Sequence, residues 1–274
     1  MLNFLKWGEA DLGIQSKVRL KSRISFLAAR WLPFRALQIL ESIGQVGLGK
    51  GWDGGISNEI QILIWLKRQM RLSRIVALDI GANKGAWAST LKHLDPSSEV
   101  HVFEPSSSTF ALLEFNLRKF SEVHFYKTAV GNSRGKANLF SNFETSPLAS
   151  LSMRRLEHQD VAFSNVEEVD VTTLDHWKLE HPGVIPNILK IDVEGHELEV
   201  LVGGKSLLSE IKIIQFEFGG THIDSKVFFQ DFWYFFLDAG FKIYRLTPRG
   251  LIKIKKYSER DEAFVFTTYY AIKK

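Results

Sequence analysis

Residues 75–85 read Ile-Val-Ala-Leu-Asp-Ile-Gly-Ala-Asn-Lys-Gly and are the most informative stretch of the chain. An apolar, β-branched run ends near an acid, and two glycines follow before an amphipathic stretch from Ala86 to His93. This order predicts a strand, a tight glycine turn and the N-terminus of a helix. Free N–H groups at a helix start favour a carboxylate or a phosphate, so the turn is a candidate binding site.

The spacing of the glycines narrows the ligand. The pattern Asp79-x-Gly81-x-x-x-Gly85 lacks the third glycine of the G-x-G-x-x-G dinucleotide fingerprint, and no G-x-x-x-x-G-K-[ST] phosphate loop occurs. This disfavours an NAD- or nucleotide-binding oxidoreductase, which stays as an alternative. The turn resembles motif I of class I S-adenosylmethionine-dependent methyltransferases. The plainer interpretation is a turn that needs glycine only for packing.

A second acid follows the next predicted strand. Residues 99–103 alternate in polarity, and Glu104 comes next, one helix and one strand after Asp79. The carboxyl ends of parallel strands meet at one edge of an open α/β sheet, where ligands bind. Glu104 can therefore accept hydrogen bonds from both ribose hydroxyls of a nucleoside. Alternatively, it is a solvated strand end before Pro105.

A second strong motif covers residues 187–204, which read as a buried strand, an acidic turn, a helix and a glycine stop. Its turn contains Asp192, Glu194, His196 and Glu197. An acid is favoured in a first helical turn, which explains Glu197 structurally. A carboxylate such as Asp192 at the end of a central strand is costly unless it is paired or used.

The order of elements predicts an α/β fold with a Rossmann-like, seven-stranded, mostly parallel open sheet and an N-terminal helical extension. We expect a helical cap with a Gly-rich linker over residues 1–70 and the main domain over 71–274. Trp52 and Asp53 in the linker form either a connection or a flap over the cofactor. The remaining expected segments are accessory strands at 136–140 and 166–171, a strand at 213–218, an aromatic core helix at 227–237, and a closing pair at 240–246 and 263–269.

Composition and charge exclude several classes. The chain has no cysteine, which excludes disulfides and thiolate chemistry, and no apolar run reaches the ~20 residues of a membrane span. We expect a cytoplasmic location. Residues 1–74 contain 12 Lys or Arg and 5 Asp or Glu, whereas the remainder is net acidic. We favour a basic helical extension packed on the domain. A surface helix on anionic lipid, and hence peripheral membrane contact, is the alternative, and no nucleic-acid motif is present.

Four motifs together resemble the FkbM-type methyltransferases over about residues 75–218. They are Leu78–Gly85, Phe103–Pro105, Thr173–Asp175 and Lys190–Glu197. The resemblance implies S-adenosylmethionine as cofactor and O-methylation of a hydroxyl, often on a sugar or polyketide. The cofactor-binding residues that it implies are Asp79, Gly81, Asn83, Gly85, Glu104 and Pro105. Many class I methyltransferases hold adenine with an acid after the third strand. Residues 128–131 offer none, so backbone groups or Asn132 would replace it.

A sugar hydroxyl is a poor nucleophile, so a general base assists methyl transfer. The candidate catalytic residues are Asp192, Glu194, His196 and Glu217, with His222 close in sequence to the last. These groups could instead hold Mg²⁺ or another hard cation, and we rank direct base catalysis ahead of metal assistance. A divalent metal is not predicted. The acceptor is expected to be a small molecule or a glycan. A noncatalytic subunit of the same fold stays as an alternative, and the oligomeric state is open.

Overall fold

The computed structural model describes residue 25, residues 30–52 and residues 54–273. The chain divides into two compact units, residues 1–47 and 48–274. The first unit contains helix α2 (Phe34–Gly47). Asp53 and much of the basic segment expected as a cap lie outside the described residues. Within the described part of the chain, no helix has the length and apolar character needed to cross a bilayer.

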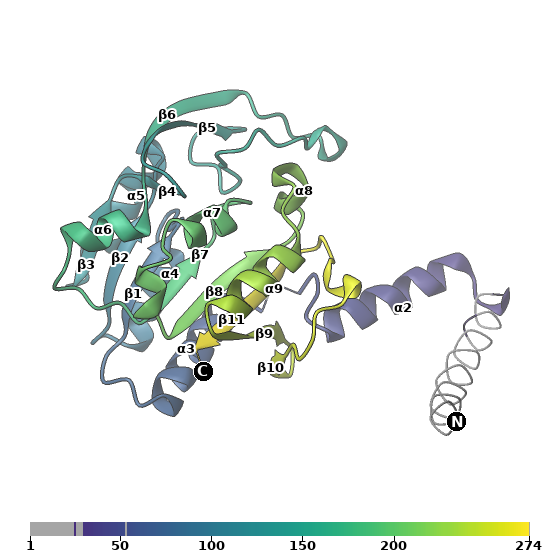
Figure 1. Ribbon diagram of the computed structural model, residues 1–274. Helices are drawn as coiled ribbons and strands as arrows, with labels where there is room; N and C mark the ends of the chain where they lie inside the picture. Colours follow the sequence, from purple (N-terminus) through teal and green to yellow (C-terminus); the bar gives the residue numbers. More distant parts are fainter. Residues whose placement is uncertain (1–24, 26–29, 53, 274) are drawn as a thin grey trace, which may run out of the picture. The chain divides into compact units, whose positions relative to one another are not determined.

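The second unit is built on an eight-stranded sheet with the order β10-β9-β11-β8-β7-β1-β2-β3 (Figure 1). Neighbouring strands from β8 to β3 run parallel, and β9, β10 and β11 are antiparallel to their partners. The strands are β1 (Val76–Ile80), β2 (Glu99–Phe103), β3 (Val123–Tyr126), β7 (Ile188–Ile191), β8 (Ile213–Phe218), β9 (Phe241–Thr247), β10 (Gly250–Lys253) and β11 (Thr267–Lys273).

The predicted α/β class with a mostly parallel open sheet is confirmed, but the sheet has eight strands instead of seven. The additional strand is β10, which forms a hairpin with β9. The closing strand was expected at residues 263–269, whereas β11 begins four residues later.

The accessory strands form a separate three-stranded sheet with the order β4-β6-β5. Its members are β4 (Ala129–Val130), β5 (Gly135–Ser141) and β6 (Asn165–Thr172). Residues 123–131 have the sequence pattern of a third strand and its exit, and the structure divides them between the two sheets as β3 and β4. In Figure 1 this small sheet lies above the carboxyl ends of the central strands. It thus brings residues 126–151 close to the edge of the sheet that holds the acidic motifs.

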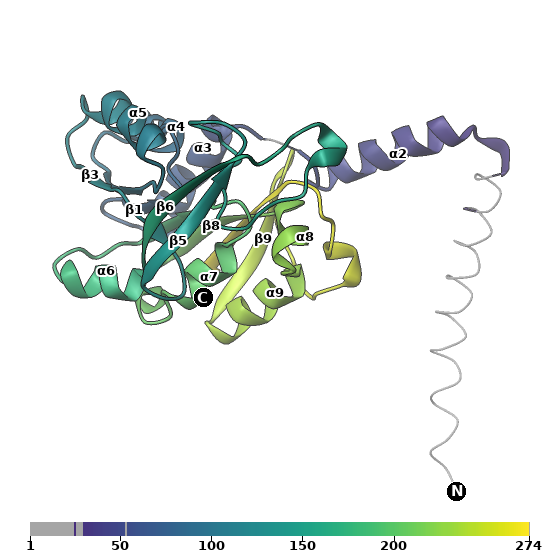
Figure 2. The same cartoon turned by 90° about the horizontal axis from the view of Figure 1, so that it is seen from above.

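Helices cover both faces of the large sheet. One face packs against α3 (Ile56–Gln69), α4 (Ala86–Leu94) and α5 (Ser107–Leu117), and Figure 2 shows these three on the same side. The other face packs against α6 (Leu174–Glu180), α7 (Glu197–Val202) and α9 (Phe229–Asp238). Short helices are α8 (Thr221–Ser225) and the 3₁₀ turns η1 (Glu157–Gln159), η2 (Leu207–Ser209) and η3 (Glu259–Asp261).

Burial explains these two layers. Successive residues of a strand point to opposite faces, so in β1 Ala77 joins the core under α3 and α4, whereas Leu78 joins the core under α7. The aromatic helix is core as predicted, since Phe229, Phe232 and Phe236 of α9 are fully buried. Helix α3 lies in the core on the opposite face of the sheet, beside α4, although residues 1–70 were expected to form an N-terminal helical cap.

Candidate active site

The turn after β1 is wedged between two neighbouring strands. Gly81 has φ of 75°, and a Cβ there would lie 1.8 Å from the carbonyl oxygen of Asp192, after β7. The N–H groups of Gly81 and Ala82 donate to the carbonyl of Phe103, at 3.0 and 2.9 Å, at the end of β2. Only glycine combines this φ with such a close approach. The backbone of Gly81 is thereby fixed at the edge where three strands end.

Gly85 has a packing role. It is the N-cap of α4 with φ of 84°, and a Cβ there would lie 2.8 Å from Leu113 and 2.9 Å from Leu117 of α5. Gly85 does not line the cavity beside Gly81. Of the two motif glycines, Gly81 therefore borders the candidate site and Gly85 allows α4 and α5 to approach.

Glu104 follows β2 and faces the cavity with its carboxylate held by backbone donors. Asn83 N–H donates to Oε2 and Ser106 N–H donates to Oε1, both at 3.0 Å. The residue is 6% exposed. Burial raises the pKa of Glu104 to about 7, and the two N–H donors oppose this rise. Glu104 therefore changes charge near neutral pH.

Lys190 connects the turn after β1 with the acid after β7. Its Nζ lies 3.1 Å from Asp79 Oδ1 and 3.4 Å from Asp192 Oδ2, and it donates to the carbonyl of Gly81 at 3.0 Å. Burial opposes the charge of Lys190, but Asp79 and Asp192 outweigh it and raise the pKa of Lys190. Asp79 is fully buried and does not line the cavity. Asp79 therefore stabilises the turn after β1 from within the core, through Lys190.

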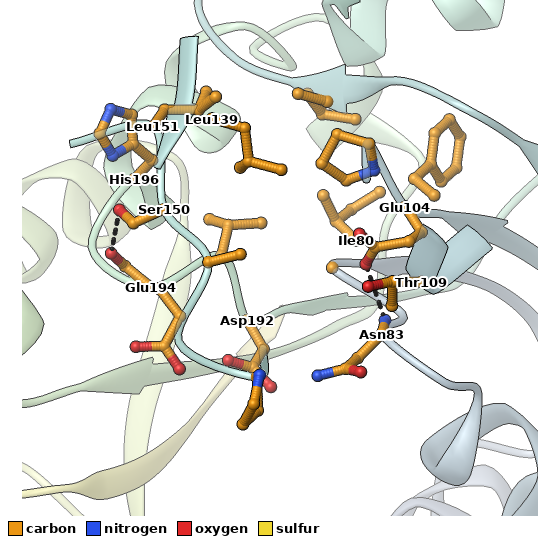
Figure 3. Close-up of a pocket in the computed structure, with 18 of the residues that line it drawn as sticks. Ile80, Asn83, Glu104, Thr109, Leu139, Ser150, Leu151, Asp192, Glu194 and His196 are labelled. Carbon is orange, nitrogen blue, oxygen red and sulfur yellow. Dashed lines mark hydrogen bonds between the residues drawn. The ribbon is translucent and has the colours of Figure 1, made fainter. Parts of the chain in front are cut away.

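The acidic turn after β7 places Asp192, Glu194 and His196 along the cavity wall. Glu194 has φ of 56°, and its carboxylate accepts from Arg154 Nη1 at 2.8 Å. Its carbonyl accepts from Ser150 Oγ at 2.9 Å. Burial raises the pKa of Glu194 to about 8, with a further contribution from Asp192. In Figure 3, Asp192 lies between Glu194 and Asn83, whereas His196 lies farther off, beside Leu151.

Glu197 and His222 are a buried structural pair. His222 Nε2 lies 2.9 Å from Glu197 Oε2, and Glu197 also accepts from the N–H groups of Val193 and Gly195. Burial opposes ionisation, but His222 and these donors lower the pKa of Glu197 below its ordinary value. Neither side chain lines the cavity that holds Asp192. The structural role expected for Glu197 agrees with these contacts, and His222 lies outside the candidate site.

The first cavity, which is lined by Gly81, Glu104 and Asp192, has a polar and an apolar half. Asn83, Glu104 and Thr109 lie on one wall, and Leu139 and Leu151 lie across the opening from them (Figure 3). Pro105 also belongs to the lining. The segment after β3 contributes Thr128, Ala129 and Val130, whereas Asn132 is not part of the lining. The cavity can therefore accommodate both a flat apolar group and a polyhydroxyl group.

A second cavity adjoins the first and shares Gly81, Asn83, Pro147 and Asp192 with it. Its other polar side chains are Glu59, Lys84, Lys190 and Glu217. Burial and the charge of Asp192 raise the pKa of Glu217 well above its ordinary value. Glu217 therefore lies in this second cavity, apart from the first, and Asp192 is the predicted catalytic residue that borders both.

Several lining residues escape sequence reasoning. The segment after β5 supplies Ser146, Pro147, Ala149, Ser150 and Leu151, none of which belongs to a motif. Glu59 comes from α3, where Gln215 Nε2 donates to its carboxylate at 2.7 Å. The sequence offered one signal for buried carboxylates near the site. This signal was Lys190, because a lysine within a buried strand requires a carboxylate partner.

Ligand spacing tests the metal alternative. Among the residues that the structure describes, the group spaced to hold a metal ion is Glu99, His101 and His124. The acids Asp192, Glu194 and Glu217 do not form such a group. The geometry at the sheet edge therefore gives metal assistance through these three acids no support.

Comparison with known proteins adds the following similarities. The model of the methyltransferase FkbM domain family matches residues 79–243. The 2-O-methyltransferase NoeI of Sinorhizobium fredii is 26% identical over 161 residues, which cover 54% of this chain and 65% of that protein. The hexuronic acid methyltransferase AglP of Haloferax volcanii is 30% identical over 142 residues, which cover 51% of this chain and 54% of that protein.

The chain thus spans less than two thirds of the length of these curated relatives. Among solved structures, the N-terminal domain of EvdMO1, determined in the presence of SAH and D-fucose, is similar with a TM-score of 0.45 and 9% identity. The similarity covers 81% of this chain and 84% of that one.

Proposed function

Because this chain belongs to the FkbM methyltransferase family, as the match over residues 79–243 shows, we propose that it transfers a methyl group from S-adenosylmethionine to a hydroxyl of a sugar or glycan. When bound, this cofactor supplies a methyl group activated by a sulfonium. Since such a methyl is already a good electrophile, the residues of the chain have two tasks. They hold the acceptor oxygen in line and remove its proton.

The lining of the first cavity supports cofactor binding there. Gly81 brings backbone to the edge of the cavity without a side chain, and Glu104 keeps lone pairs free beyond the two N–H bonds that it accepts. An ionised Glu104 is the acceptor that two ribose hydroxyls require. Phe103, Leu139 and Leu151 offer apolar surface for adenine, and Asn83 adds an amide. Asp79 and Gly85 then contribute by holding the loop and α4 in place.

The position of Asp192 at the border of the two cavities is the main support for the proposed mechanism. Among the predicted catalytic residues, it alone borders both the first cavity and the second. A carboxylate in this place reaches a hydroxyl that enters from the second cavity and approaches the first. We assign Asp192 the role of general base, which takes the proton of that hydroxyl as the new carbon–oxygen bond forms.

Lys190 and Glu217 interact with this base. The Nζ of Lys190 lies 3.4 Å from Asp192 Oδ2, and the neighbouring acids raise the pKa of Lys190, so a cation faces the proposed base. Burial and the charge of Asp192 raise the pKa of Glu217 well above its ordinary value, which favours its protonated form. Glu194 is held by Arg154 and faces the first cavity. These differences separate Asp192 from the two other acids as the proton acceptor.

The chemistry of the second cavity supports a polyhydroxyl acceptor. Glu59, Asp192 and Glu217 offer several oxygens to hydroxyl donors, and Trp87 and Phe266 add apolar surface. The similar proteins NoeI and AglP carry names that describe a 2-O-methyltransferase and a hexuronic acid methyltransferase. Both the lining and these names favour a sugar or a glycan.

The test is the variant Asp192→Asn, which keeps the shape of the side chain and removes its charge. Methyl transfer should fall by roughly 10²–10⁴-fold, the usual contribution of a general base. Binding of S-adenosylhomocysteine should change little. Asp238→Asn, an exposed acid at the end of α9, is the matched control and should retain full activity.

Two results would contradict this assignment. Near-normal turnover of Asp192→Asn on the true acceptor would move the search to Glu194, His196 and Glu217. If Asp192 were instead a metal ligand, chelation of the wild type would reproduce the loss and added Mg²⁺ would restore it. Under the proposed base mechanism, neither treatment changes the rate.

A further inference from the structure

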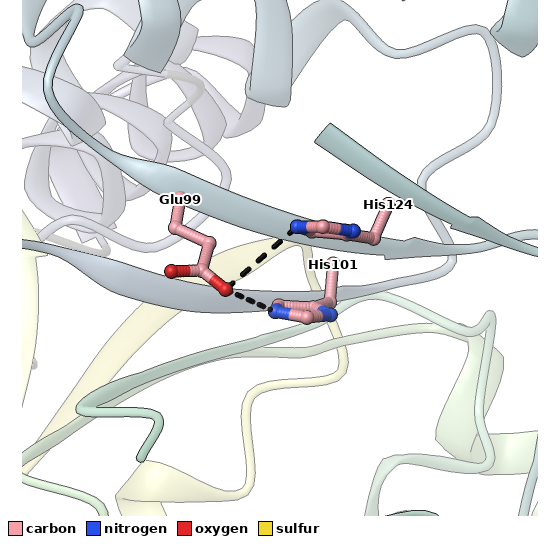
Figure 4. A group of neighbouring side chains, drawn as sticks. All are labelled: Glu99, His101 and His124. Atoms are coloured by element: carbon pink, nitrogen blue, oxygen red, sulfur yellow. Dashed lines mark hydrogen bonds and ion pairs between the residues drawn. The ribbon is translucent and has the colours of Figure 1, made fainter. Parts of the chain in front are cut away.

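Three potential ligand side chains gather at the amino end of β2. Glu99 and His101 are two positions apart on this strand, so their side chains project from the same face of the sheet. His124 is the register partner of His101 on the neighbouring parallel strand β3. The topology alone therefore places two imidazoles and one carboxylate side by side, and Figure 4 shows both rings directed at the carboxylate.

The three side chains already lie close to ligand spacing. Glu99 Oε1 lies 3.0 Å from His101 Nε2 and 3.7 Å from His124 Nε2. All three ligand atoms lie within 4.8 Å of one another. Atoms that bind one Zn²⁺ tetrahedrally at ~2.0–2.1 Å are separated by about 3.3 Å. Movements of about 1 Å or less in each side chain would complete this geometry.

The buried imidazole of His101 has the support that a ligand needs. Its Nδ1 lies 3.0 Å from the hydroxyl of Tyr126. A ligating histidine donates its second N–H to such a partner, which fixes the ring and the tautomer. Tyr126 is therefore placed to support Nε2 as the ligand atom.

We propose that Glu99, His101 and His124 form a Zn²⁺ site, separate from the proposed site of methyl transfer. Two imidazole nitrogens and one carboxylate oxygen form a donor set typical of zinc and unlike the all-oxygen sets of Mg²⁺ and Ca²⁺. The side chain of His124 is 47% exposed, so the fourth position opens to solvent. Water completes the tetrahedron there.

Binding requires one rearrangement. The rings of His101 and His124 are stacked with centroids 4.5 Å apart and planes 16° from parallel, so their Nε2 lone pairs run side by side. His124 has to rotate about its side-chain bonds until the two lone pairs converge, and its exposure leaves room for this. Arg74 lies 3.3 Å from Glu99 Oε2, which leaves Oε1 to the ion.

The position of the site predicts a structural role. Glu99 begins β2, whereas Glu104 follows its other end, so their Cα atoms are about 16 Å apart at ~3.3 Å per residue. The ion is therefore remote from the acids of the candidate active site. Strand β3 is the edge strand of the sheet, bound to β2 alone. A metal ion between His101 and His124 would tie this edge strand to its neighbour.

The experiment is a calorimetric titration of chelator-treated protein with Zn²⁺. We expect one equivalent to bind and to raise the melting temperature. His124→Ala should abolish this binding while the far-UV spectrum stays native. His158→Ala, a change of an exposed histidine on η1, is the matched control and should bind Zn²⁺ as the wild type does. Tyr126→Phe should weaken binding by roughly 10–100-fold through loss of the support to His101.

A second readout does not depend on variants. Co²⁺ bound in place of Zn²⁺ should give the intense visible bands of a four-coordinate ion, and Zn²⁺ should displace them. No saturable binding by the wild type would overturn the proposal. So would Zn²⁺ binding that survives in His124→Ala, or binding that is lost instead in His176→Ala, since His176 lies 3.2 Å from Glu180 on helix α6.

Discussion

Replacing Lys190 with methionine should destabilise the protein severely. Lys190 Nζ lies 3.1 Å from Asp79 Oδ1, and Asp79 is fully buried, so Lys190→Met leaves a carboxylate in the core without its cation. Removing one partner of a buried ion pair costs about 3–5 kcal/mol. For a domain of this size, each kcal/mol corresponds to about 2–4 °C in melting temperature, so we expect a fall of roughly 6–20 °C.

Replacing Asp79 while keeping Lys190 should destabilise the protein less. In Asp79→Asn, Lys190 keeps Asp192 at 3.4 Å and the carbonyl of Gly81 at 3.0 Å, so its charge stays compensated. The double variant Asp79→Asn with Lys190→Met contains no buried charge at this pair. Its free energy of unfolding should therefore lie above that of Lys190→Met alone, as buried pairs replaced by neutral groups often show.

The sign of the pH dependence gives an independent check. Burial already raises the pKa of Asp79, with Lys190 in opposition, and loss of Lys190 raises it further. A carboxyl group whose folded pKa is raised contributes stability at pH below its unfolded pKa and loses it as pH rises through the folded pKa. The loss in the free energy of unfolding that Lys190→Met causes should therefore be larger at pH 8 than at pH 5.

Chemical denaturation of the wild type, both single variants and the double variant at these two pH values measures each quantity. A deficit of less than ~1 kcal/mol for Lys190→Met would refute the argument, because it would fall within the range of exposed pairs. A deficit that does not depend on pH would refute it too. Exact additivity of the two single changes would show that Asp79 and Lys190 do not act as a pair.

Further predictions concern three residues of the candidate site: Glu104, Gly81 and Glu217. Because burial raises the pKa of Glu104 to about 7, the affinity of the wild type for S-adenosylhomocysteine should rise from pH 6 to pH 8. Glu104→Gln should bind it ~1.5–3 kcal/mol more weakly in calorimetry and without this pH dependence, and a flat wild-type profile would contradict us. Gly81→Ala should abolish cofactor binding because its Cβ would meet the carbonyl of Asp192, whereas Gly183→Ala, where the Cβ meets no atom within 4 Å, should bind normally. Glu217→Gln should keep most of the methyl-transfer rate, since the raised pKa of Glu217 favours a neutral side chain that glutamine imitates, and a loss as large as that of Asp192→Asn would make Glu217 the base.

Local sequence patterns predicted the parts of the site that are local in the chain. The turn at Gly81 and the acids Glu104 and Asp192 follow directly from apolar strands that end in glycine or acid. The rule that parallel strands end at a common edge was then sufficient to bring these residues together. The two glycines of this motif have different roles. Gly81 borders the first cavity, whereas Gly85 allows α4 to pack on α5.

Residues brought together by register and by long loops could not be predicted in this way. Asp79 and Lys190 meet because they are register partners on β1 and β7, which no local pattern encodes. Leu151 reaches the first cavity from a segment without periodicity, and Glu59 reaches the second cavity from α3. Strand β10 (Gly250–Lys253) was missed, and its place in the sheet comes from its antiparallel pairing with β9.

The most direct test of the central claim is mass spectrometry of acceptors incubated with the purified protein and S-adenosylmethionine. The acceptors are a panel of sugars, sugar nucleotides and lipid-linked glycans. We predict that at least one gains a single methyl group on a hydroxyl, with one S-adenosylhomocysteine formed per methyl transferred. A protein that binds NAD but neither binds S-adenosylhomocysteine nor methylates any hydroxyl of the panel would contradict the account.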